Sequence, residues 1–168
     1  MRKALTIVAG ALLCISAWGQ TSARDIISIL RGSGSVSCNY SYTAKGDFPV
    51  SGQGSALISG KMYHLTGTDT EIWCDGVSIW TVDKAGKEVV ISDGSASPLS
   101  RLEDYAEIIH IRSYSGGSLR CSIKNETQGL DIDFSADGIT TGPATEDAGL
   151  FSFDTSSLGK DWIITDLR

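Results

Sequence analysis

The sequence has few of the residues that most enzyme sites and nucleic-acid-binding surfaces require. It contains two histidines, His64 and His110, and no phosphate loop, dinucleotide fingerprint, Gly-x-Ser-x-Gly or His-Glu-x-x-His motif. Its 14 Lys and Arg residues form no cluster and are outnumbered by 20 Asp and Glu, which gives a formal charge of −6. These absences argue against an enzyme, and against a protein that binds nucleic acid or anionic lipid headgroups.

Cysteine is scarce and widely spaced after the first residues. Cys38, Cys74 and Cys121 lie far apart and no Cys-x-x-Cys pair occurs, so the spacing predicts neither a metal site nor a redox motif. We expect no cofactor. The three cysteines allow one disulfide and one free thiol, in three pairings, and they suit buried core thiols equally well. The sequence leaves these alternatives open.

The main apolar run lies at the N-terminus and is too short to cross a bilayer. Arg2 and Lys3 precede the apolar residues 4–15, whereas a membrane-spanning helix needs about 20 such residues. A basic start, a short apolar stretch and small residues before the cut are typical of a secretory signal peptide. We therefore predict a signal peptide at residues 1–19, cut after Gly19, and export to the periplasm.

Cleavage at this point leaves one domain, residues 20–168, of 168 − 19 = 149 residues. That length is enough to bury a core, and the mature formal charge becomes −6 − 2 = −8. A cut after Ala23 would also suit the signal. We do not expect lipid anchoring at Cys14, because that cut requires a small residue before the cysteine and Leu13 is large.

Alternation of apolar and polar residues predicts many half-buried strands. In residues 36–43, Val, Cys and two Tyr residues alternate with Ser, Asn and Thr, which is the period of a strand with one apolar face. Asp131 and Asp133 share one face of such a strand, and we interpret them as its solvated side rather than as a catalytic pair. The predicted strands are 36–43, 52–59, 61–68, 70–74, 78–83, 88–92, 118–125, 129–136, 149–154 and 162–165.

Two helices are also predicted. Residues 23–30 place Ile26, Ile27 and Leu30 at helical spacing before a Gly-Ser-Gly stop. Residues 98–111 begin with a proline after a serine that could cap the helix, carry apolar residues at helical spacing, and precede Gly116 and Gly117.

The alternation predicts a mainly β (α+β) fold. An antiparallel sheet with one polar face must cover its apolar face with a second sheet or with helices. With only two short helices available, we expect a strongly curved antiparallel sheet, an unclosed barrel whose mouth the helices cover and whose hollow could take a ligand. The alternative is a sandwich whose aromatic side chains fill the core.

The order of several segments resembles the LolA-like outer-membrane lipoprotein carrier family over essentially the whole mature chain. The segments are Gly-Ser-Ala-Leu-Ile at 54–58, Ile-Trp-Cys-Asp-Gly-Val-Ser-Ile-Trp at 72–80, Phe-Ser-Phe-Asp at 151–154 and the closing strand at 163–168. The tyrosine-rich strands and Cys-Asp-Gly resemble divergent, Bacteroidetes-type carriers more than proteobacterial ones. Proteobacterial members have Arg-Pro after the first of these segments, whereas this chain has Lys61 and Met62 there.

The resemblance implies a periplasmic carrier for the acyl chains of lipoproteins, or for another lipid. Such a carrier would receive cargo from an inner-membrane lipoprotein-releasing transporter and pass it to an outer-membrane receptor, acting as a monomer. A non-carrier sensor or adaptor of the periplasm, built on the same fold, is the alternative. A sandwich without a cavity is a third reading.

The residues expected to line the hollow are those on the apolar side of each predicted strand, with two more from the second helix. They are Tyr40, Tyr42, Ile58, Tyr63, Leu65, Trp80, Val90, Leu102, Ile109, Ile132, Phe134, Phe151 and Phe153.

Overall fold

The computed structural model describes residues 22–46, 49–96, 103–145 and 147–168. The predicted signal peptide, its cleavage site and Cys14 lie outside the described residues, as does Leu102. Among the described residues, no helix is long and apolar enough to span a membrane.

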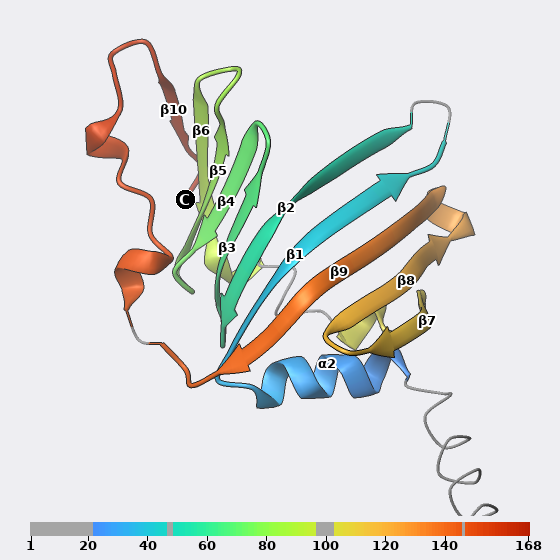
Figure 1. Cartoon of the computed structure of the whole chain (residues 1–168). Helices are drawn as coiled ribbons and strands as arrows, with labels where there is room; N and C mark the ends of the chain where they lie inside the picture. The colour runs from blue at the N-terminus through green and yellow to red at the C-terminus, as the bar shows by residue number, and fades with distance from the viewer. Residues whose placement is uncertain (1–21, 47–48, 97–102, 146) are drawn as a thin grey trace, which may run out of the picture.

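Ten strands and one α-helix make up most of the described chain (Figure 1). Short 3₁₀ turns occupy Gly94–Ala96, Glu126–Gln128, Ala148–Leu150 and Thr155–Ser157. The helix and strands are α2 (Ala23–Gly32), β1 (Ser35–Ala44), β2 (Val50–Ser59), β3 (Met62–Gly67), β4 (Thr70–Cys74), β5 (Ser78–Asp83), β6 (Glu88–Asp93), β7 (Ile109–Ser115), β8 (Ser118–Asn125), β9 (Leu130–Gly142) and β10 (Ile163–Asp166).

All ten strands belong to one sheet in the order β10-β6-β5-β4-β3-β2-β1-β9-β8-β7. Every pairing is antiparallel except that of β10 with β6, which is parallel. The mainly β fold predicted from the alternation is thus confirmed. The predicted strong curvature is not found, because the sheet is neither closed nor strongly curled. Instead its two halves, β3–β6 with β10 and β7–β9 with β1 and β2, run in visibly different directions (Figure 1).

The helix α2 forms where the sequence predicts it. Ser22 caps its first turn: the Ser22 hydroxyl accepts a hydrogen bond from the Asp25 backbone N–H, and the Asp25 carboxylate accepts one from the Ser22 N–H. Ile26 and Ile27 are buried, and Ile26 packs against Leu119 of β8 and Ala136 of β9. The helix therefore covers one face of the β1–β9–β8 part of the sheet.

The second predicted helix, 98–111, is wrong in its last residues. Residues 97–102 lie outside the description, residues 106–108 form a turn, and Ile109 begins strand β7. Gly116 and Gly117 do not follow a helix but form the two-residue turn of the β7–β8 hairpin, with φ of +58° and +75°. Two consecutive positive φ angles are what a type I′ hairpin turn requires, and two glycines meet that requirement without strain.

The predicted strand 149–154 is also wrong. The structure has one 3₁₀ turn at the start of this segment, Ala148–Leu150, and another just after it, Thr155–Ser157. Asp147 and Asp154 each accept a hydrogen bond from the backbone N–H two residues later, on Gly149 and Ser156. Such Asx turns compete with the extended backbone of a strand. The segment containing them lies beside β3–β6 (Figure 1), and its Phe153 packs onto Val82, Val89 and Ile91.

The two faces of the sheet differ in chemistry. The face that carries Tyr42 and Phe134, which lie opposite each other, is apolar, and we call it the cavity face. On the opposite face, serine and threonine hydroxyls pair across strands: Ser37 with Thr140 and Ser41 with Ser135, each at 2.7 Å. One residue of register slip would exchange the two faces, so this pattern fixes the strand register.

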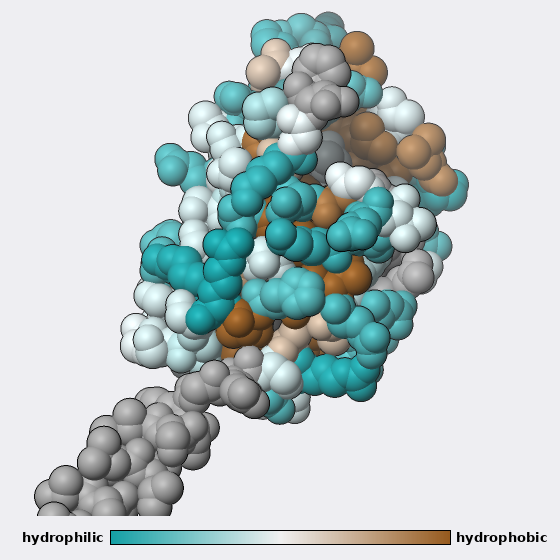
Figure 2. Space-filling model, turned by 90° about the vertical axis from the view of Figure 1, so that its right-hand side faces the viewer, coloured by the Kyte–Doolittle hydropathy of each residue, from teal (hydrophilic) through white to brown (hydrophobic). Residues whose placement is uncertain are grey.

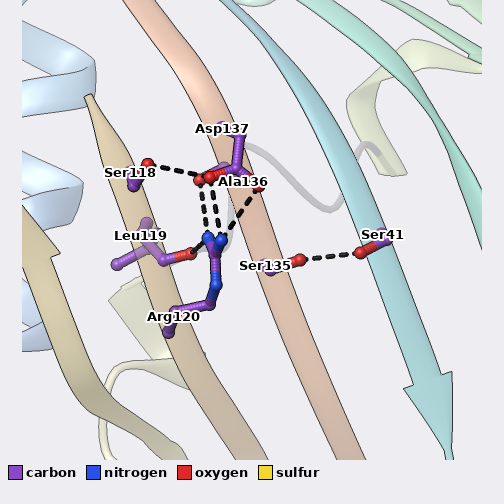
Figure 3. Close-up of polar contacts among 7 residues, drawn as sticks. All are labelled: Ser41, Ser118, Leu119, Arg120, Ser135, Ala136 and Asp137. Atoms are coloured by element: carbon purple, nitrogen blue, oxygen red, sulfur yellow. Dashed lines mark hydrogen bonds and ion pairs between the residues drawn. The ribbon is translucent and has the colours of Figure 1, made fainter. Parts of the chain in front are cut away.

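Arg120 connects β8 to β9 on the polar face (Figure 3). Its guanidinium donates to the Leu119 carbonyl at 2.9 Å, to the Ala136 carbonyl at 3.3 Å and to both carboxylate oxygens of Asp137. The Ser118 hydroxyl also donates to Asp137, and hydrogen bonds from Ser118 and Arg120 lower the pKa of that carboxyl. These contacts hold β8 against β9 on the polar face, in the part of the sheet whose other face α2 covers.

Candidate binding cavity

A cavity of about 630 Å³ lies on the cavity face of the sheet. This volume is within the range of ligand sites, roughly 300–1,000 Å³. Helix α2 contributes Ile26 and Ile29, and the rest comes from the sheet and its turns. The lining residues are Ile26, Ile29, Val36, Cys38, Tyr40, Tyr42, Ser51, Gly52, Gln53, Ala56, Ile58, Leu65, Gly67, Thr68, Asp69, Thr70, Ile72, Tyr114, Leu119, Phe134, Ala136 and Ile139.

Strand β1 forms the long axis of the cavity. Alternate residues of β1 point into it, from Val36 near α2 to Tyr42 near the β1–β2 loop. The six residue-to-residue steps from Val36 to Tyr42, at about 3.3 Å each, give a length of about 20 Å. The cavity is therefore an elongated apolar groove rather than a compact pocket.

Two glycines of β2 make room for the tyrosines. Gly52 lies opposite Tyr42, and Gly54 lies opposite Tyr40. A Cβ on Gly52 would lie 2.7 Å from the Tyr42 ring, and a Cβ on Gly54 would lie 3.0 Å from the Tyr40 hydroxyl. The rings can therefore lie across the neighbouring strand, where aromatic side chains cover backbone that glycine leaves bare.

The Tyr40 side chain joins several strands of the cavity wall. Its ring stacks on that of Phe134 with centroids 6.4 Å apart, and its hydroxyl donates to the Thr66 carbonyl at 3.3 Å. Burial raises the pKa of Tyr40, with smaller contributions from Tyr42 and Cys38. Burial also raises the pKa of the Cys38 thiol, so only a small fraction is thiolate at neutral pH and alkylation of Cys38 is slow.

The two ends of the cavity differ in polarity. At the α2 end the wall is Val36, Leu119, Ala136 and Ile139. At the other end the wall contains Ser51 and Gln53 from the start of β2, Thr68 and Asp69 from the β3–β4 connection, and Thr70, the first residue of β4. Apolar surface is also visible between polar side chains on the side of the molecule nearest β7 and β8 (Figure 2).

Five of the residues expected from the sequence line this cavity. Tyr40, Tyr42, Ile58, Leu65 and Phe134 all do so. Their contact with a ligand stays a prediction. They share the cavity face because the cross-strand register places them on the same side of the sheet.

Trp80 lies on the opposite face. The register places Trp80 opposite Trp73 and Ile91, and all three belong to the cluster around Val82 and Val89. Alternation does not reveal this, because strands β4–β6 are apolar on both sides: Ile79, next to Trp80, packs in a separate cluster with Tyr63 and Cys74. The prediction that Trp80 lines the hollow is therefore corrected.

Six other expected residues do not line the cavity. Tyr63 is buried with Cys74, Ile109 packs against Ala23 and Ile27, and Phe153 contacts Trp73 on the opposite face. Phe151 is fully buried after a 3₁₀ turn. Val90 and Ile132 are half-buried and do not line the cavity.

Several lining residues were missed by the sequence analysis. Cys38, Ala56 and Ala136 share the parity of predicted residues on their own strands, whereas Leu119 belongs to β8, from which no lining residue was predicted. Tyr114 was missed because its strand, β7, overlaps the segment predicted as helix and turn. The polar end was missed because no pattern within one strand shows that the start of β2 and the β3–β4 connection lie together.

Titratable groups gather on the opposite face. His64 stacks on Trp73 with centroids 3.4 Å apart, and its Nε2 lies 3.6 Å from Glu71 Oε2. Burial lowers the pKa of His64, outweighing the attraction of Glu71. Burial raises the pKa of Glu71, but the hydrogen bond and charge of Lys84 more than reverse this and lower it.

Asp131 and Asp133 lie on the same polar face and are partly solvated, as predicted. Asp133 makes ion pairs with Lys45 at 2.6 Å and Arg112 at 2.5 Å. Within the described part of the chain, no group of three or more His, Cys, Asp or Glu side chains is placed to hold a metal ion. All three described cysteines, Cys38, Cys74 and Cys121, are free thiols.

Comparison with known proteins shows the fold and no more. Neither a protein-family model nor a curated protein matches the sequence. Among solved structures, an uncharacterized conserved protein from Thermus thermophilus is similar, with a TM-score of 0.51 and 10% sequence identity. The similarity covers 87% of this chain and 99% of that chain.

Proposed function

We propose that this protein is a periplasmic carrier that binds the acyl chains of a lipoprotein, or of another lipid, and moves them toward the outer membrane. The observation that carries the proposal is the elongated apolar cavity between α2 and the open sheet. The signal-like N-terminus and the resemblance to LolA-like carriers support it. In that family an unclosed barrel is covered by helices, and we propose that α2 has the corresponding role of a lid.

The cavity suits cargo that must be both shielded and released. Each buried CH₂ group contributes about 0.8 kcal/mol, so an acyl chain along β1 would gain several kcal/mol. The cavity is not sealed, because Ile29 of α2 is 44% exposed. Partial exposure limits the gain, which keeps transfer to a receptor feasible.

Cys38 offers a direct test of occupancy. It lines the cavity, whereas Cys74 and Cys121 are buried outside the lining. We expect a saturating neutral acyl compound, such as a monoacylglycerol, to slow the alkylation of Cys38 by a maleimide. Mass spectrometry of the digested protein would report each cysteine separately. Protection that is equal at all three thiols would indicate general stabilisation and would contradict binding in this cavity.

Transport needs a second experiment, with spheroplasts that contain labelled, newly acylated lipoproteins. We expect the mature protein to release a soluble complex into the supernatant. Phe134→Asp should abolish release, and Ser135→Asp, one residue away on the polar face, should retain it. Binding at Cys38 without release, by folded protein and with an energised transporter, would instead favour a sensor or adaptor that uses the same cavity.

A further inference from the structure

The cavity lining carries charge of one sign. Of the described residues that line it, Asp69 is the one with a charged side chain, and none is Lys or Arg. Asp69 lies in the β3–β4 connection at the polar end, next to Thr68 and Thr70. A ligand whose chain lies along β1 toward α2 would place its polar end near this carboxylate.

Several basic side chains near the cavity are engaged elsewhere. On α2, Arg24 pairs with Glu107 at 2.9 Å, and Arg31 pairs with Glu103. Lys84, whose backbone N–H donates to the Asp69 carbonyl at 2.8 Å, extends its ammonium to Glu71. Glu71 lies directly across from Val82 of β5, on the face opposite the cavity. The Lys84 ammonium therefore does not reach the cavity lining.

We infer that the cavity selects amphiphiles whose polar end bears no negative charge, and that Asp69 sets this preference. This inference rests on the proposed function, since it concerns the ligand of the same cavity. An anionic head, carboxylate or phosphate, would meet the Asp69 carboxylate without a lining cation to offset the repulsion. An uncharged head meets no such repulsion, and an ammonium head gains the attraction of Asp69.

The test compares three probes with the same twelve-carbon chain at neutral pH: dodecylammonium, monolauroylglycerol and laurate. Affinities would be measured by calorimetry below the micellar concentration of each probe. We expect laurate to bind at least tenfold more weakly than the other two. Asp69→Asn should bring dodecylammonium and laurate within about threefold of each other, and Asp69→Lys should reverse their order. Monolauroylglycerol should bind all variants alike.

A matched control separates the local effect from net charge. Glu88→Lys changes the total charge as Asp69→Lys does, at an exposed position of β6 outside the cavity lining. We expect this variant to keep the wild-type order of the three probes. Laurate binding as tightly as monolauroylglycerol to the wild type would overturn the inference and leave the proposed function standing. Absence of binding by all three probes would overturn the proposed function and, with it, this inference.

Discussion

At the scale of single residues, two glycines of β2 differ in what an added Cβ would meet: a side chain at one and backbone at the other. A Cβ on Gly52 meets the outer atoms of the Tyr42 ring, which can move aside. A Cβ on Gly54 would lie 1.6 Å from the carbonyl oxygen of Thr66, which is backbone in the paired strand β3. The two positions look alike in sequence, yet only Gly54 is fixed by a close backbone approach.

We predict that Gly54→Ala destabilises the protein strongly and Gly52→Ala does not. Separating β2 from β3 to admit a methyl group should cost about 2 kcal/mol or more, in the range of overpacking in a core. Gly52→Ala should change the free energy of unfolding by less than about 1 kcal/mol, because the entropy that alanine saves in a strand offsets the displacement of Tyr42. Urea denaturation measures both, and equal costs would refute the distinction.

His64 gives a pH dependence whose sign follows from its environment. Burial lowers the pKa of His64 in the folded protein below its ordinary value near 6.5. Below that value the unfolded chain binds a proton that the folded protein resists, so this contribution to stability is present above pH 6.5 and is lost as the pH falls. We expect His64→Gln to flatten the decline in melting temperature from neutral pH toward about pH 5.5. His110→Gln, at an exposed position, should keep the wild-type slope.

At the scale of elements, α2 is held mainly by apolar contact. The Arg24–Glu107 and Arg31–Glu103 ion pairs are largely exposed, with side-chain exposures of 71% and 79%, and 43% and 65%. Pairs of this kind contribute about 0–1 kcal/mol each. Ile26, by contrast, is 5% exposed and packs against two strands.

We therefore predict that Ile26→Ala lowers the free energy of unfolding by about 2–5 kcal/mol, as for other buried isoleucines. The double variant Arg24→Ala and Arg31→Ala should lower it by less than about 2 kcal/mol. Ile26→Ala should also speed alkylation of Cys38, since both residues line the cavity. A larger loss from the arginine variant would show that the ion pairs, and not the apolar face, hold the helix.

The elements also show how much of this fold the sequence could predict. Strands β1, β2 and β8 follow from alternation because one face of each is polar. The helix predicted at 98–111 extended too far because Ile109 fits the apolar stripe of a helix. Ile109 and Ile111 fit the two-residue period of a strand equally well. Five cavity residues followed from parity, but the face of Trp80 depended on register with Trp73 and Ile91, which is a long-range property.

At the scale of the whole molecule, the length of the cavity should limit how far binding affinity rises with the length of the ligand chain. The groove along β1 runs from Val36 to Tyr42, about 20 Å at about 3.3 Å per residue. For a series of monoacylglycerols from octanoyl to stearoyl, we predict that each added CH₂ strengthens binding by up to about fourfold, equivalent to about 0.8 kcal/mol. Affinity should then level off once the chain fills the groove. Calorimetry checks this, and affinity that is independent of chain length would contradict it.

The pairing of β10 with β6 has a consequence for the order in which the sheet forms during folding. Ile163 lies beside Glu88, so the outer edge of β6 stays unpaired until a segment much later in the sequence has been made. Until then, Val89, Val90 and Ile91 belong to an open strand edge, the kind of surface on which chains aggregate. A nascent chain is therefore prone to aggregation until β10 is made and pairs with β6 to cover this edge.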